Sequence, residues 1–147
     1  MFKRILIPTD GTAASNHAIK IGSELAKRYG ATLTFFHVSR TYQSLYYPDG
    51  MALAWPAEAG YTKEAAAAAN KVLTSASALA KKQKVKTVTA HAYNDSPADA
   101  ILTTAKKVKA DLIVMASHGR KGIDRLLLGS ETQKVLAHTK LPVLVVR

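Results

Sequence analysis

The chain has 147 residues, enough to bury a substantial core, and we expect one domain over residues 1–147. It contains no cysteine, which excludes disulfides and thiolate metal sites. No stretch is long and apolar enough for a membrane span or a signal peptide, so we expect a cytoplasmic protein. The formal charge of +11 favours anionic partners, namely phosphates, nucleic acid or acidic membrane surfaces.

The first part of the chain predicts a strand, a helix and a second strand. Residues 2–8 have an apolar centre, apolar residues recur at helical spacing over 14–25 before Gly30, and residues 31–38 are again strand-like. Asp10 therefore follows the carboxyl end of a strand, where doubly wound sheets form their ligand crevice. Its local sequence is nearly as consistent with a turn or capping aspartate.

The least regular segment, residues 39–60, concentrates large rings: Tyr42, Tyr46, Tyr47 and Trp55. A loop of this length is typical of a lid or a partner surface, and we expect one of those roles. The alternative is that the rings pack over the core. Alanine content and periodicity predict a long helix after Tyr61.

The second half of the chain continues the alternation of strands and helices. Residues 87–92 alternate as in a half-exposed edge strand, and Ser96 with Pro97 starts a helix. The continuous apolar run 112–116 is typical of a strand buried on both faces, and residues 143–146 form a last strand. The pattern indicates an α/β fold, a doubly wound, Rossmann-like parallel sheet.

The loop after the strand at residues 112–116, together with the start of the helix that follows, contains the residues suited to ligand binding. Gly129 and Ser130 open a helix whose first backbone amides need an acceptor, and an anion would satisfy them. Ser130 followed by Gln133 also matches a capping box, which needs no ligand, and the local sequence alone favours that simpler interpretation. The preceding loop shifts the balance towards phosphate, because it contains Gly119 and the cations Arg120, Lys121 and Arg125.

In this segment the chain resembles the ATP-binding subgroup of the universal stress protein family, whose motif is G-x2-G-x9-G-[ST]. Residues 116–119, the nine that follow, and then Gly129 and Ser130 stand in that pattern, with Ala116 in place of the first glycine. The resemblance covers essentially the whole chain and implies five parallel strands in the order 3-2-1-4-5. It also implies an ATP site, with any magnesium arriving on the phosphates, at Pro8, Thr9, Asp10, Val38, Met115, Ala116, His118, Gly119, Arg120, Gly129, Ser130, Glu131 and Thr132.

The resemblance implies a stress-response protein that acts by binding an adenine nucleotide and by signalling. In the family the aspartate matching Asp10 lies in the nucleotide site, and the residue matching Val38 meets adenine through its backbone. No general base for ATP hydrolysis can be named, so efficient catalysis is not expected. His37 is expected to be a packed or hydrogen-bonded histidine, and the last strand is expected to form a homodimer, as in the family.

Two further function classes remain open at this point. One is a nucleotide-independent homodimer that meets protein partners through the aromatic segment. The other is nucleic-acid association through the lysine clusters 81–86 and 106–109. Nucleic acid ranks last, because these lysines fall at predicted helix C-termini, where cations complement the helix dipole, and no aromatics are interleaved with them. No membrane partner is expected.

Overall fold

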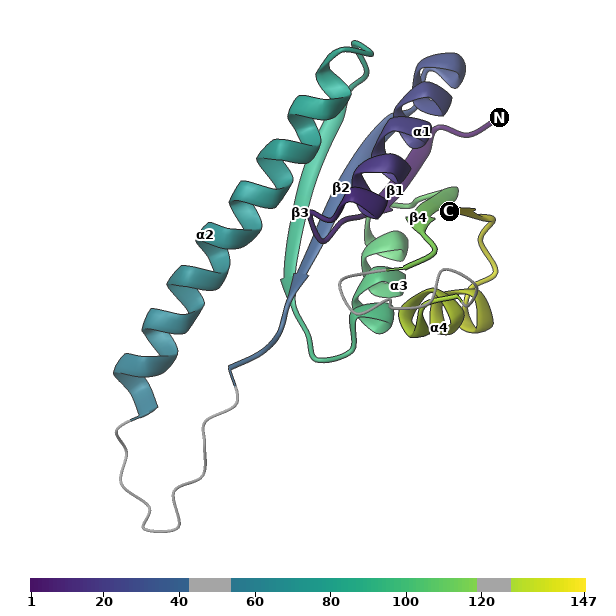
Figure 1. Cartoon of the computed structure of the whole chain (residues 1–147). Coiled ribbons are helices and arrows are strands. Elements are labelled where there is room, and N and C mark those ends of the chain that lie inside the picture. Colours follow the sequence, from purple (N-terminus) through teal and green to yellow (C-terminus); the bar gives the residue numbers. More distant parts are fainter. Residues whose placement is uncertain (43–53, 119–127) are drawn as a thin grey trace.

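The computed structural model describes residues 1–42, 54–118 and 128–147, with the backbone alone for residues 54–57. Strands and helices alternate along the chain as predicted (Figure 1). The elements are β1 (Arg4–Pro8), α1 (Ala13–Tyr29), β2 (Thr32–Ser39), α2 (Ala54–Lys81), β3 (Thr87–Tyr93), α3 (Pro97–Lys107), β4 (Leu112–Ala116), α4 (Ser130–His138) and β5 (Val143–Val146).

The five strands form one parallel sheet in the order β3-β2-β1-β4-β5, which confirms the predicted fold and strand order. β1 pairs with β2 at Ile5 and Leu33, and with β4 at Leu6 and Ile113. β3 lies at one edge, as expected, and β5 at the other. All strand carboxyl ends therefore lie at one end of the sheet and all amino ends at the opposite end.

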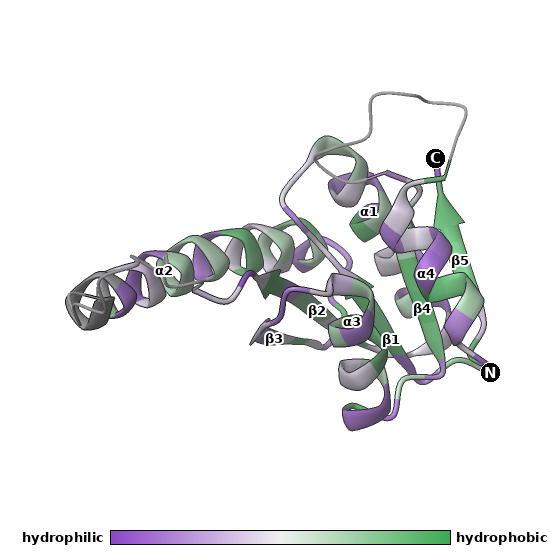
Figure 2. Ribbon diagram, turned by 90° about the horizontal axis from the view of Figure 1, so that it is seen from below, coloured by the Kyte–Doolittle hydropathy of each residue, from purple (hydrophilic) through white to green (hydrophobic). Residues whose placement is uncertain are grey.

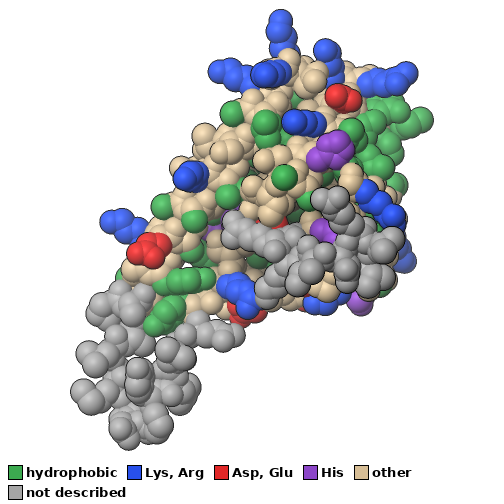
Figure 3. All heavy atoms as spheres, in the orientation of Figure 1, with side chains coloured by type: hydrophobic (Ala, Val, Ile, Leu, Met, Phe, Trp, Pro, Cys, Tyr) green, Lys and Arg blue, Asp and Glu red, His purple; other side chains and the backbone are tan. Residues whose placement is uncertain are grey.

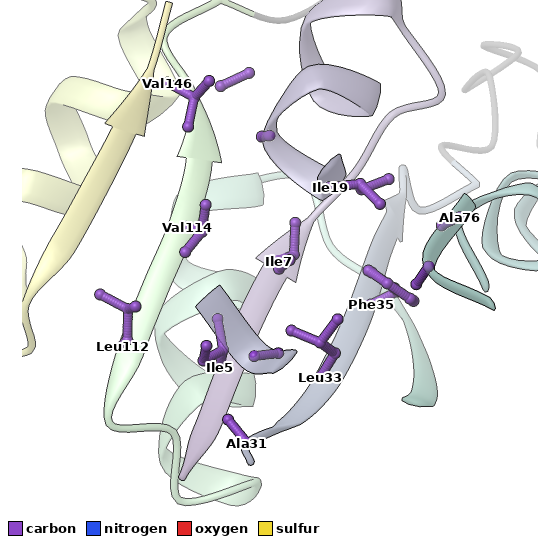
Figure 4. Packing of buried hydrophobic residues seen from close by; sticks show 14 of the residues in the cluster. Ile5, Ile7, Ile19, Ala31, Leu33, Phe35, Ala76, Leu112, Val114 and Val146 are labelled. Carbon is purple, nitrogen blue, oxygen red and sulfur yellow. The ribbon is translucent and has the colours of Figure 1, made fainter. Parts of the chain in front are cut away.

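The central strands build a core on each face of the sheet, because successive side chains point to opposite sides. Ile5 and Ile7 pack with α1 and α2, including Ile19 of α1, as Figure 4 shows. Leu6 and Ile113 pack on the other face with α3 and α4. Figure 2 shows the most hydrophobic residues concentrated on these strands. Burying each such side chain contributes about 1.5–3 kcal/mol, so the two cores hold the sheet between its helices.

The start of α2 differs from the prediction, which placed it after Tyr61. The helix begins at Ala54, because Pro56 lies in the first turn, where a missing N–H costs no helical hydrogen bond. Tyr46 and Tyr47, two of the predicted aromatic-loop residues, lie outside the described residues.

At the described ends of the aromatic segment, residues 39–60, two tyrosine rings pack together. The rings of Tyr42 and Tyr61 lie 5.6 Å apart, and the Tyr61 hydroxyl donates to the Arg40 carbonyl oxygen at 2.9 Å. α2, although the longest helix of the described chain, is too polar to span a bilayer, and none of the other described helices qualifies either.

Three of the described helices are followed, at the amino end of the sheet, by a residue in the left-handed backbone conformation. α1 ends at Gly30, with φ of 65°. α2 is followed by Lys84 with φ of 55°, and α3 by Lys109 with φ of 52°. The Lys109 N–H donates to the Lys106 carbonyl at 3.1 Å, and the Ala110 N–H donates to a carbonyl of the same last turn at 2.8 Å. Glycine is the residue that this conformation favours, so only α1 ends with the expected residue.

Candidate functional site

A cleft of about 510 Å³ opens at the carboxyl ends of β1, β2 and β4 and is bordered by the first turns of α3 and α4. All of the predicted site residues that the structure describes line it, namely Pro8, Thr9, Asp10, Val38, Met115, Ala116, His118, Gly129, Ser130, Glu131 and Thr132. Gly119 and Arg120, together with Lys121 and Arg125, lie outside the described residues. Residues far apart in the chain meet here because parallel strands bring their ends together.

The segment after β1 is held rigidly at the bottom of the cleft. Thr9 is buried, its N–H donates to the Phe36 carbonyl at 2.8 Å, and its hydroxyl donates to the Ser15 hydroxyl at 3.1 Å. The His37 Nδ1–H donates to the Thr9 carbonyl at 2.8 Å. His37 is thus a hydrogen-bonded histidine, as predicted, and it ties β2 to the β1 terminus.

Asp10 has both of the features that the sequence left open. Its Oδ1 accepts from the Thr12 N–H at 3.0 Å and from the Thr12 hydroxyl at 2.6 Å, an arrangement typical of an aspartate that shapes a turn. It also lines the cleft. The two hydrogen bonds hold Asp10 in a fixed orientation just before α1, whose N-cap is Thr12.

Buried hydrogen bonds fix the β4 end against α4. The Thr132 hydroxyl donates to the Ala116 carbonyl at 3.0 Å, and the Gly129 N–H donates to the Ser117 carbonyl at 2.7 Å. The Ser117 N–H in turn donates to the Val146 carbonyl at 2.8 Å. Ala116, which replaces the first glycine of the motif, has no left-handed backbone, so its position does not require glycine.

The N-terminus of α4 shows that the capping-box interpretation was wrong. Gly129 occupies the N-cap position and makes no side-chain capping bond, and Ser130 is already the first helical residue. The Gln133 side chain donates to the Leu128 carbonyl at 2.6 Å instead of reaching back to an N-cap amide. Ser96, the expected cap of α3, also makes no side-chain capping bond. The first turn of α4 therefore borders the cleft with an N-cap residue, Gly129, that has no side chain to cap it.

Glu131 provides the acceptor that Ser96 does not. One carboxylate oxygen accepts from the Ala98 N–H in the first turn of α3 at 2.8 Å, and the other lies 3.0 Å from Lys134 Nζ. Sequence reasoning did not reveal this contact, since it joins two helices 33 positions apart. The carboxylate is therefore fixed in the wall of the cleft, beside the helix end expected to bind phosphates.

The cleft also contains charged residues that sequence reasoning missed: Arg40, Asp95 and Lys134. Arg40 and Asp95 follow β2 and β3, so their positions after predicted strands were a usable signal. Together with Asp10 and Glu131, they give the described walls three carboxylates against two permanent cations. The formal excess of +11 is therefore concentrated elsewhere on the described surface or in the undescribed segments.

A second polar cluster lies between β2 and β3 and borders the cleft through His37. The rings of His37 and His91 are 6.0 Å apart, and His91 Nε2 forms a hydrogen bond with the Ser39 hydroxyl at 2.8 Å. Burial, and to a lesser extent the neighbouring His37, lowers the pKa of His91 below its ordinary value. The cluster therefore favours a neutral His91 at neutral pH.

The comparisons with known proteins agree with one another. A sequence model of the Universal stress protein family matches residues 1–147. The chain is 37% identical over 147 residues to a universal stress protein of Thermus aquaticus, with 100% of both chains covered. It is 34% identical over 148 residues to one of Methanocaldococcus jannaschii, covering 100% of this chain and 83% of that relative.

Solved structures show the same fold. Universal stress protein UspA from Lactobacillus plantarum superposes with a TM-score of 0.83 at 26% identity, covering 99% of this chain and 97% of its own. A universal stress protein in complex with cAMP gives 0.66 at 24% identity, covering 99% and 97%. One from Archaeoglobus fulgidus in complex with dAMP gives 0.68 at 18% identity, covering 99% and 98%.

Proposed function

The chain belongs to the universal stress protein family, and from this we propose that it binds an adenine nucleotide, ATP in our expectation, in the cleft at the strand carboxyl ends. Binding would alter how the protein meets its signalling partners. The observation that carries the proposal is the N-terminus of α4, where Gly129 and Ser130 line the cleft and the N-cap residue, a glycine, has no side chain to cap the helix. A helix end of this kind stabilises an anion through its amides and its dipole.

The residues around that helix end suit the remaining parts of a nucleotide. Val38 lies at the β2 end, where a backbone contact to adenine is expected, and Asp10 lines the same cleft, as expected for the aspartate of the nucleotide site. Structural neighbours in complex with cAMP and dAMP support an adenine nucleotide as the ligand class. Any magnesium would be held mainly by the phosphates. Among the described side chains, no group of three or more His, Cys, Asp or Glu residues is placed to hold a metal.

Two measurements test the proposal. The purified protein is denatured, and any released nucleotide is identified by mass spectrometry. Calorimetric titration then compares the parent protein with Gly129→Val, which places a branched side chain at the uncapped helix end. We expect an adenine nucleotide in the first experiment, and loss of binding by Gly129→Val in the second. Gly60→Ala is the control, because no described atom lies within 4 Å of the added methyl and Gly60 does not line the cleft.

Equal nucleotide affinity in the parent and in Gly129→Val would contradict the assigned site. No binding of any adenine nucleotide by the parent would favour the alternative function, a nucleotide-independent homodimer that binds proteins. One feature supports that alternative. β5 is an edge strand with three partly exposed apolar residues, Val143, Leu144 and Val145.

A further inference from the structure

Lysine and arginine residues precede every strand at the amino end of the sheet, opposite the cleft. In the spatial order of the strands, these cations are Lys86 before β3, Arg28 before β2, Lys3 before β1, Lys109 before β4 and Lys140 before β5. We call these five residues the amino-end row. All five are exposed. Because every strand is parallel, segments distant in sequence contribute to one line of charge.

Hydrogen bonds tie the backbone at three members of the row, Lys86, Lys3 and Lys109, to the strand beside it. The Lys86 carbonyl accepts from the Leu33 N–H, and the Lys3 carbonyl accepts from the Thr32 N–H, both at 2.9 Å. On the other side of β1, Arg4 Nε donates to the Lys109 carbonyl at 2.6 Å. Adjacent strands lie about 4.8 Å apart, so five strands spread the row over roughly 19 Å.

Asp111 offsets part of the row's charge without forming an ion pair with any of its side chains. Asp111 is the acidic residue beside the row, and its two oxygens accept from the backbone N–H groups of Lys3 and Arg4 at 2.8 and 3.0 Å. Within the described residues, no member of the row forms a salt bridge. More lysines flank the row in the last turns of α2 and α3 (Figure 3 shows basic side chains projecting at the upper end of the molecule).

The backbone supplies an independent observation. Lys84 and Lys109 both adopt the left-handed conformation in which α1 uses Gly30. A side chain is strained there and glycine is not, so neither lysine is favoured by local stability. The helix dipole favours cations anywhere in the last turn of a helix. It does not explain why the left-handed position after the helix, which favours glycine, is a lysine at both Lys84 and Lys109. The chain therefore keeps positive charge at this end against its backbone preference.

We propose that the amino-end row binds the phosphate backbone of double-stranded nucleic acid without sequence preference. A line of exposed point charges matches a linear array of phosphates, whereas an acidic membrane presents a broad sheet of charge. The two rings adjacent in sequence to members of the row, Phe2 and Tyr29, pack edge to face on each other with their centroids 5.8 Å apart. This contact occupies part of the ring surface that unpaired bases would stack on, which favours a duplex over a single strand. From sequence the lysine clusters ranked low as a nucleic-acid site, because they fall at helix C-termini and no aromatics are interleaved with them. The fold adds that Lys3 and Arg28 lie at the same end of the sheet.

The test measures binding of a short labelled DNA duplex by fluorescence anisotropy over a range of salt concentrations. The variant is Lys84→Gly with Lys109→Gly, which removes one charge of the row and one charge beside it, two residues before Lys86, and relieves two left-handed side chains. We expect its melting temperature to stay equal or rise, while duplex affinity falls roughly tenfold per lysine at about 0.1 M salt. The slope of log affinity against log salt should flatten by roughly one unit per lysine.

The matched control is Lys63→Ala with Lys71→Ala, which removes the same charge from exposed positions of α2 away from the row. It should retain the duplex affinity of the parent. If both double variants lost the same amount of duplex affinity, the effect would come from net charge alone, and the assigned site would be wrong. A parent that binds acidic phospholipid vesicles but no duplex at low salt would also overturn the site. Nucleotide binding in the cleft should be unchanged in both variants, so failure here is distinguishable from failure of the proposed function.

Discussion

At the scale of single residues, we expect the Glu131 carboxylate to weaken ATP binding in the proposed cleft. Its carboxylate is fixed by the Ala98 N–H and by Lys134, beside the expected phosphate position. Replacing Glu131 with Gln keeps an acceptor for Ala98 and removes the negative charge. We expect ATP to bind about two- to fivefold more tightly to this variant, since the carboxylate is partly exposed and its repulsion is screened.

Calorimetry with adenosine provides the control for Glu131→Gln, because a neutral ligand should bind equally to the parent and the variant. If ATP and adenosine gained affinity by the same factor, the gain would not be electrostatic. Melting temperature should fall slightly in the variant, because the Ala98 N–H loses a charged acceptor at a helix N-terminus.

His91 makes stability depend on pH. Burial first, and His37 second, lower its pKa in the folded protein, so the unfolded chain binds the proton more readily. The contribution to stability is therefore complete above the ordinary histidine pKa of about 6.5, and it is lost as the pH falls towards the lowered folded value. Thermal melts between about pH 7 and pH 5 should show a falling melting temperature in the parent.

The variant His91→Gln should show a weaker fall across the same window, because glutamine keeps a polar partner for Ser39 and does not titrate. His17→Gln is the control, since His17 is exposed on α1. Parallel melting curves against pH for the parent and His91→Gln would show that His91 does not cause the dependence.

At the scale of elements, two helical glycines test how closely α1 packs on the sheet. A Cβ at Gly22 would lie 2.4 Å from Ile7 Cδ1, and Ile7 is fully buried between α1 and the strand core. A Cβ at Gly60 in α2 would meet nothing within 4 Å. Gly22→Ala should destabilise the fold by about 1–3 kcal/mol through overpacking. Gly60→Ala should stabilise it by roughly 0.5–1 kcal/mol through helix propensity.

Chemical denaturation of the two alanine variants measures both effects on one scale. The same substitution in two helices should give opposite signs, because only one glycine faces the sheet. A stabilised Gly22→Ala would mean that α1 can move away from β1 at little cost.

At the scale of the whole molecule, we expect a homodimer through β5. Val146 is buried in the core, so a charge there would unfold the protein rather than test the interface. Val145 is a better position, because it is partly exposed and belongs to neither buried core cluster. Val145→Lys should yield a monomer by light scattering, since a charge would be placed in the strand-to-strand contact.

Val88→Lys, on the opposite edge strand β3, is the matched control and should leave the dimer intact. A parent that is monomeric at micromolar concentration would exclude this dimer. A dimer lost in Val88→Lys and kept in Val145→Lys would place the contact on the other edge.

The sequence by itself determined the strands, most helix positions and the end of the sheet that holds the cleft. Periodicity reports which faces are buried, and parallel strands must bring Asp10, Val38 and Gly129 to one edge, so these features follow from local patterns. The start of α2 was missed because Pro56 is compatible with a first turn as well as with a loop.

Only the tertiary structure decided which side chains become partners. Ser130 lost its predicted capping role, and Glu131 caps a helix 33 positions away, because a polar side chain binds the nearest acceptor or donor in space. In the same way, Lys86, Lys3 and Lys109 lie in one row only because the sheet brings the starts of β3, β1 and β4 to the same end. Local sequence encodes burial and backbone preference, whereas contacts between distant segments exist only once the chain has folded.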